Sequence, residues 1–169
     1  MDRSEFWSII ERSSPASTAD RDTRLARLEE ALARLPVPEV VAFDALFHEL
    51  RCRAYTWDLW AAAYLLNGGC SDDGFMDFRS WLVSLGRTRF ERALLDADSL
   101  ADVPVDDDEE GAAFEEFGYV ASRVVEARTG RPLPPSTVVD GPSPAGEPFE
   151  ESEEHLARRL PRLWAAHGW

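Results

Sequence analysis

The residues best able to do chemistry are concentrated in residues 67–79, which combine carboxylates, a thiol and an arginine. Asp73 and Asp77 are four residues apart, so on a helix they share a face, which suits a metal ion or a ligand cation. Arg79 follows them and could bind a phosphate or carboxylate group. The structural alternative is that Asp72 and Asp73 sit in the first turn of a helix and interact with its unpaired N–H groups.

The two cysteines have spacings that match neither a zinc site nor a disulfide framework. Cys70 is expected just before a helix begins, and the N-terminus of a helix lowers the pKa of a nearby thiol. Nucleophilic catalysis would also need a base, and none of the three histidines is close to Cys70 in the sequence. Cys52 is expected to be a small packed helix residue.

A helix, a glycine turn and a second helix are expected to position these groups over residues 57–82. Residues 61–66 are good helix formers, and Asn67-Gly68-Gly69 is a strong helix stop. Ser71 fits the N-cap of the second helix. Phe75 and the apolar residues that follow it at helical spacing are expected to face the core.

Aromatic side chains flank this turn and would form the walls of a pocket or part of the core. Asp58 lies between two tryptophans, and if it is buried it needs a partner such as Arg53 or Arg79. The candidate binding residues are Trp57, Asp58, Trp60, Tyr64, Cys70, Asp72, Asp73, Asp77, Arg79 and Trp81. An ion pair of Arg79 with Asp58 or Asp77, with no cavity left, would make the cluster structural.

The remaining pattern predicts a mainly α fold, a compact single-domain helical bundle spanning residues 1–169. Helices are expected from a cap at Ser4, from Ala19 to Leu35, from near Glu39 up to Leu66, at 87–95, at 114–130, and from Ser152 with a bend or restart at Pro161. A kink near Tyr55-Thr56 is left open for the third of these helices. Residues 106–110 are acidic and are expected to form a solvated loop. Prolines and glycines make residues 131–148 an irregular arm, in which residues 137–139 could form a short edge strand.

Composition limits the possible partners. The net charge is −14, and residues 93–169 carry 17 acidic and 6 basic side chains, against 15 and 12 in residues 1–92. A surface this acidic disfavours nucleic-acid backbones and anionic membranes, and it would attract a cationic partner. No apolar run approaches ~20 residues and no signal peptide is visible, so we expect a cytoplasmic protein.

The central stretch, from Ala54-Tyr55-Thr56-Trp57 through Gly68-Gly69-Cys70-Ser71-Asp72-Asp73 to Ser80-Trp81-Leu82, resembles the bacterial domain-of-unknown-function family 4240. Phe6-Trp7 and the run 160–164 are similar to the ends of that family. The resemblance implies a small, mainly helical, soluble bacterial protein. It implies no catalytic residues, because the family carries no settled activity.

Two functions from different classes follow from these residues. The first is an acidic protein-interaction or inhibitor-type module whose unknown partner has a basic surface. The second is a metal-assisted hydrolase or small-ligand-binding protein that uses the polar cluster at 67–79, with Asp73 and Asp77 as weak metal candidates. No cofactor is expected. Convergence of Asp73, Asp77 and Arg79 on one pocket would favour the second.

Overall fold

The computed structural model describes residues 1–14, 20–105 and 111–169 of the chain. Helices dominate these residues and no strand forms among them apart from one isolated bridge, so the predicted mainly α class is confirmed. The elements are α1 (Arg3–Ser13), α2 (Arg21–Ala33), α3 (Val37–Arg53), α4 (Trp57–Leu66), α5 (Asp72–Ser84), α6 (Arg87–Leu95), η1 (Ala97–Asp102), η2 (Glu116–Tyr119), α7 (Val120–Thr129), α8 (Glu153–Arg159) and α9 (Pro161–His167). No helix among the described residues has both the length and the apolarity needed to cross a bilayer.

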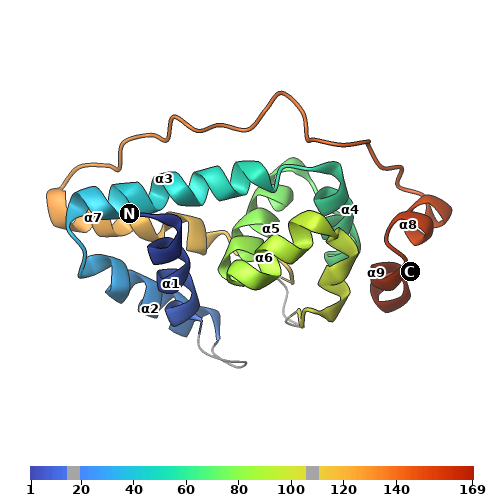
Figure 1. Ribbon diagram of the computed structural model, residues 1–169, viewed down its shortest axis with the longest axis horizontal. Coiled ribbons are helices and arrows are strands. Elements are labelled where there is room, and N and C mark those ends of the chain that lie inside the picture. Colours follow the sequence, from blue (N-terminus) through green and yellow to red (C-terminus); the bar gives the residue numbers. More distant parts are fainter. Residues whose placement is uncertain (15–19, 106–110) are drawn as a thin grey trace.

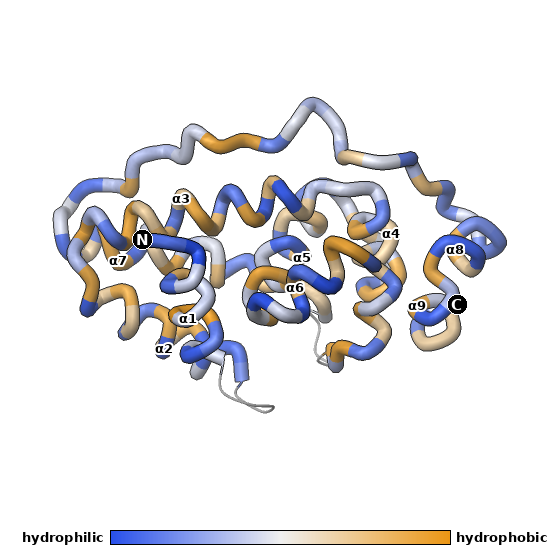
Figure 2. Tube along the Cα trace, viewed as in Figure 1, coloured by the Kyte–Doolittle hydropathy of each residue, from blue (hydrophilic) through white to orange (hydrophobic). Residues whose placement is uncertain are grey.

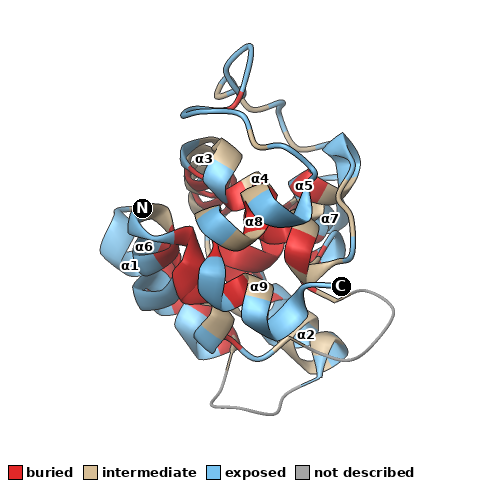
Figure 3. Cartoon of the chain, turned by 90° about the vertical axis from the view of Figure 1, so that its right-hand side faces the viewer, coloured by how far each residue is buried: buried red, intermediate tan, exposed pale blue. Residues whose placement is uncertain are grey.

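Helix α3 runs from the end of the molecule near α7 to its middle, where α4 follows it (Figure 1). It packs against α1, α5 and α7. Phe43, Phe47 and Leu50 of α3 are buried, and the buried residues of the other helices surround them in a continuous core (Figure 3). Apolar and polar residues alternate along the helices (Figure 2), which is the pattern of elements that each bury one side.

The helix expected to run from near Glu39 up to Leu66 is two helices, α3 and α4, because the helical conformation is interrupted between Arg53 and Trp57. The side chain of Thr56 accepts a hydrogen bond from the N–H of Leu59 at 3.2 Å and caps α4. Apolar residues keep their helical spacing through residues 54–56, so the apolar pattern by itself does not mark the interruption. A Thr in N-cap position was the available signal.

Other boundaries differ by a few residues. The cap of α1 is Asp2, which forms a reciprocal capping box with Glu5, and not Ser4. The expected start of the second helix at Ala19 and the acidic loop at 106–110 lie outside the described residues. The expected helix at 114–130 consists of η2 followed by α7.

Residues between α7 and α8 form the irregular arm that the prolines and glycines predicted. The arm runs alongside α3 from the end of α7 to α8 (Figure 1). Residues 137–139 are not a strand, so that hypothesis was wrong. The arm's regular pairing is instead at Ala145, whose N–H donates to the carbonyl of Tyr55 and whose carbonyl accepts from the N–H of Trp57, both at 2.9 Å.

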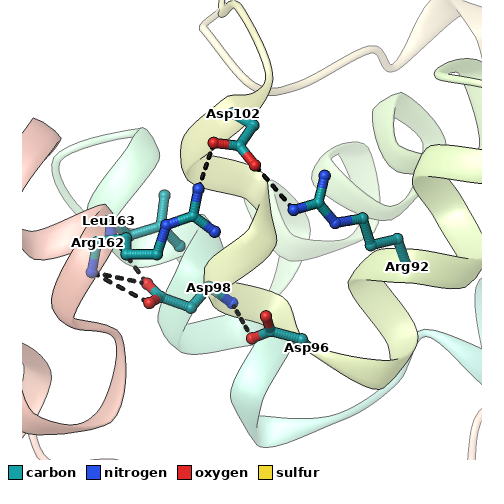
Figure 4. A network of polar contacts seen from close by, with 6 residues as sticks. All are labelled: Arg92, Asp96, Asp98, Asp102, Arg162 and Leu163. Atoms are coloured by element: carbon teal, nitrogen blue, oxygen red, sulfur yellow. Dashed lines mark hydrogen bonds and ion pairs between the residues drawn. The ribbon is translucent and has the colours of Figure 1, made fainter.

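The last two helices are separated at Pro161, as expected, and α9 is capped by a residue far away in the sequence. Asp98 of η1 accepts hydrogen bonds from the N–H groups of Arg162 and Leu163, at 3.1 and 2.9 Å. Asp102, on the same short helix, pairs with Arg162 and with Arg92 of α6 (Figure 4). Helix η1 therefore anchors the end of the chain to the body.

Candidate functional site

The glycine turn between α4 and α5 has the expected geometry. Gly68 and Gly69 have positive φ values of 65° and 126°, which glycine adopts without strain. The N–H of Gly69 donates to the carbonyl of Tyr64 at 2.8 Å and closes α4. The hydroxyl of Ser71 accepts from the N–H of Gly74 at 3.2 Å, so Ser71 is the N-cap of α5.

Aromatic rings behind the turn form a stacked series. The rings of Trp57 and Trp60 stack with centroids 5.3 Å apart, and Trp60 stacks on Phe75 at 4.8 Å. The indole N–H of Trp60 donates to the carbonyl of Cys70 at 3.1 Å. The hydroxyl of Tyr64 donates to a carboxylate oxygen of Glu151 at 3.1 Å. These rings hold the turn and the arm against the helices.

The carboxylates of α5 differ in their exposure. Asp72 and Asp73 are exposed in the first turn of the helix, which fits a capping role. Asp77 is half-buried, and its pKa is raised above its ordinary value by burial and by the negative charges of Glu115 and Asp73, which outweigh the opposing positive charge of Arg51. Glu116 raises the pKa of Asp77 further.

Arg79 is on the same helix but is buried in the core side of α5, with 2% of its side chain exposed. Its guanidinium makes a two-pronged pair with the carboxylate of Asp140 in the arm, with N–O distances of 2.7 and 2.8 Å. The partner is thus neither Asp58 nor Asp77. Asp73, Asp77 and Arg79 do not converge on one pocket.

Asp58 is exposed and pairs with Arg159 of α8 at 2.7 Å, so neither Arg53 nor Arg79 is its partner. Its side chain lines a hollow of about 300 Å³ beside Ala145 and Gly146. A wider hollow of about 750 Å³ lies between α1 and α2, and none of the predicted site residues lines it. Trp81 is buried.

The environment of Cys70 does not favour a reactive thiol. Burial, together with the charges of Asp77 and Asp72, raises the pKa of the Cys70 thiol to about 12. The expected lowering by the helix N-terminus is therefore outweighed, chiefly by burial and to a lesser extent by these two carboxylates. Among the described residues, no three His, Cys, Asp or Glu side chains are grouped in a way that could hold a metal ion.

A polar cluster that the sequence did not reveal lies between α3 and the arm. Arg51 and Cys52 of α3 face Arg79 and Asp140, and burial with a hydrogen bond to Asp140 raises the pKa of the Cys52 thiol to about 11. His48 is nearby, and its pKa is lowered by burial. The polar positions of α3 were the available signal, since they interrupt an otherwise apolar helix. Nothing in the arm's irregular sequence singled out Asp140.

Two features thus emerge from the predicted site. One is an acidic face, which we define as Asp73 and Asp77 of α5 with Glu115 and Glu116 beside them. The other is the arginine pair, which we define as Arg51 and Arg79.

Comparison with known proteins gives one match, to the family described as "Protein of unknown function (DUF4240)", over residues 1–127. No curated protein and no solved structure matches the chain. The match covers α1 through most of α7 and includes both the turn and the arginine pair. The arm and the last two helices lie outside it.

Proposed function

The chain belongs to the family DUF4240, and we propose that it acts as a protein-interaction module whose acidic face binds a basic surface of another protein. An inhibitor that masks such a surface is the version we favour. The proposal includes a cytoplasmic location for the protein, which is expected from the sequence. The observation that carries the proposal is the grouping of four carboxylates that make no ion pair with any described residue.

The acidic face costs free energy in the isolated protein. Asp73 and Asp77 are four residues apart on α5, and like charges at that spacing destabilise a helix by roughly 0.2–0.5 kcal/mol. The backbone bond from the N–H of Phe114 to the carbonyl of Asp77, 3.1 Å long, fixes the chain next to Glu115 against α5 and keeps the charges together. A cationic partner would remove this repulsion on binding.

The surroundings of the acidic face also suit a protein partner. Met76 is 41% exposed on α5 and Tyr119 is 52% exposed at the end of η2. The hydroxyl of Tyr119 donates to Glu115 at 3.4 Å, which ties the ring to the acidic face. Exposed Met and Tyr side chains provide apolar contact area at protein interfaces. The net charge of −14 would steer a basic partner towards the protein and repel nucleic acid.

The test compares two variants of equal charge in a pull-down from a lysate of the native host. In the first, the acidic face is neutralised by Asp73→Asn, Asp77→Asn and Glu116→Gln. In the control, three exposed carboxylates elsewhere that make no ion pair with described residues are neutralised by Glu29→Gln, Glu126→Gln and Glu150→Gln. Cross-links to the retained protein are mapped by mass spectrometry.

We expect the wild type and the control variant to retain the same basic protein, and the face variant to lose it. Retention should weaken when salt is raised from about 50 to about 300 mM, because ions screen exposed charges. Cross-links should fall on α5 and η2. Equal retention by all three proteins, or cross-links confined to other elements, would overturn the proposal.

A further inference from the structure

Arg79 is held in a fixed orientation by residues of the family-matched part of the chain. Its guanidinium lies over the neighbouring rings of Tyr55 and Phe75, with distances of 4.8 and 5.1 Å to the ring centroids. One terminal nitrogen donates to the carbonyl of Arg51 at 3.0 Å, and Nε donates to the carbonyl of Phe75 at 3.4 Å. The forked end of the side chain therefore points at one place, where an oxyanion would accept two parallel hydrogen bonds.

Arg51 adds a second cation at the same place. Burial lowers the pKa of Arg51, as does the positive charge of Arg79, while Asp140, Cys52 and Asp77 raise it. The buried Nε of Arg51 has no acceptor among the described residues. An unpaired buried donor is a cost that a bound acceptor removes. Asp140 thus interacts with both arginines, and one buried donor of Arg51 is left over.

The carboxylate of Asp140 belongs to an irregular segment, unlike the two arginines, which lie on helices. Asp140 lies in the irregular arm, outside residues 1–127, and its side chain is 33% exposed. Burial by itself would raise the pKa of Asp140, but the hydrogen bonds and charge of Arg79 outweigh burial and hold it below its ordinary value. The nearest backbone attachment of the arm to the body is at Ala145. A partly exposed carboxylate on an irregular arm can be displaced by a competing carboxylate from another molecule.

We propose that the arginine pair is a binding site for the carboxylate group of a small molecule, and that Asp140 occupies this site as an internal ligand. A ligand carboxylate replaces Asp140 between Arg51 and Arg79. The arm between α7 and Ala145 is then released from α3. This site is distinct from the acidic face and does not depend on the function proposed for that face.

A chemical-rescue experiment tests the site. Asp140→Ala removes the internal carboxylate, and acetate is supplied as the probe, with sodium chloride at equal ionic strength as the reference. Asp102→Ala is the matched control, because Asp102 also pairs with arginine, in its case Arg92 and Arg162, but in an exposed setting (Figure 4). Asp140→Ala combined with Arg51→Gln tests whether the second arginine is part of the site.

We expect acetate, and not chloride, to raise the melting temperature of Asp140→Ala, and to bind it about tenfold or more tightly than the wild type, in which the arm competes. The Asp102→Ala variant should show no response specific to acetate, and Arg51→Gln should reduce the response of Asp140→Ala. Equal responses of wild type and Asp140→Ala, or no response of Asp140→Ala, would overturn the proposal.

A second measurement applies to the wild type alone and remains informative if Asp140→Ala does not fold. Hydrogen exchange of residues 131–144 is compared in acetate and in chloride at equal ionic strength. Exchange in this segment should be faster in acetate, while exchange in α3 and α5 stays unchanged. Identical exchange of the arm in acetate concentrations up to about 1 M would contradict displacement of Asp140.

Discussion

Neighbouring residues of α5 have different environments, which their closeness in the sequence does not reveal. Asp77 and Arg79 are two positions apart, so they point to different sides of the helix. Asp77 is half-buried beside other carboxylates, whereas Arg79 is buried in the core and reaches the arm. The residue types suggested chemistry, but the helix periodicity that separates them also separates their functions. The partner of Arg79 is 61 residues away, beyond any local pattern.

At the residue scale, neutralising Asp77 should stabilise the protein. Its folded-state pKa is raised, so the charged carboxylate is a penalty that is fully present well above the folded pKa and absent below the ordinary value of 3.8. Asp77→Asn should therefore raise the free energy of unfolding at pH 7 by about 0.2–0.5 kcal/mol, the value for a like-charge pair on a helix.

Urea denaturation of wild type and Asp77→Asn between pH 3 and pH 7 measures this effect. The difference between the two proteins should shrink as the pH falls and the wild-type carboxylate becomes protonated. Glu126→Gln on the exposed side of α7 serves as a control with the same change in charge. A destabilised Asp77→Asn protein at pH 7 would show that the carboxylate has a stabilising partner.

At the scale of elements, local signals predicted helix ends well where the capping residue is close in sequence. Ser71 and Ser152 cap the helices that directly follow them, as their positions indicated. Thr56 does the same for α4, but the continuous apolar spacing favoured one longer helix. Helix α9 is different, because Pro161 predicts its start while the cap, Asp98, is supplied by η1. Such a cap depends on tertiary structure and could not be read from local sequence.

Asp98 should matter more for stability than an ordinary exposed cap. Its side chain is buried, and it accepts hydrogen bonds from the N–H groups of Arg162 and Leu163 at the start of α9. Asp98→Ala leaves those donors without their acceptor and should lower the free energy of unfolding by about 1–2 kcal/mol. Ser152→Ala, which removes an exposed cap of α8 with a 3.4 Å bond, should cost only about 0.5 kcal/mol.

Urea denaturation followed by tryptophan fluorescence compares these two cap variants, and hydrogen exchange shows where the loss is felt. Faster exchange should be concentrated in α9 for Asp98→Ala and in α8 for Ser152→Ala. Equal losses of stability in the two variants would mean that the buried position of Asp98 adds nothing to its role as a cap.

At the scale of the whole molecule, the mainly helical class followed from periodicity, but the path of the arm did not. Proline and glycine content predicts that residues 131–148 are irregular and says nothing about where they lie. The contacts that place the arm are the pairing of Ala145 with the chain at Tyr55 and Trp57 and the bond of Asp140 to Arg79. The arm therefore reaches the same region as the predicted turn, from outside the family-matched residues.

The charge of the whole molecule leads to a prediction about salt. The net charge of −14 makes the folded protein repel itself, and residues 93–169 carry most of the excess. Salt also weakens surface ion pairs such as Arg92 with Asp102, but each exposed pair contributes only about 0–1 kcal/mol. Self-repulsion should dominate, because the acidic residues outnumber the basic ones by 32 to 18.

Raising sodium chloride from about 10 to about 150 mM, which shortens the screening length to about 8 Å, should therefore raise the melting temperature by a few degrees. The neutralised acidic-face variant should show a smaller rise, since it starts with three fewer negative charges. A melting temperature that falls with salt would mean that the ion pairs outweigh the repulsion and that the acidic surface is balanced in the folded protein.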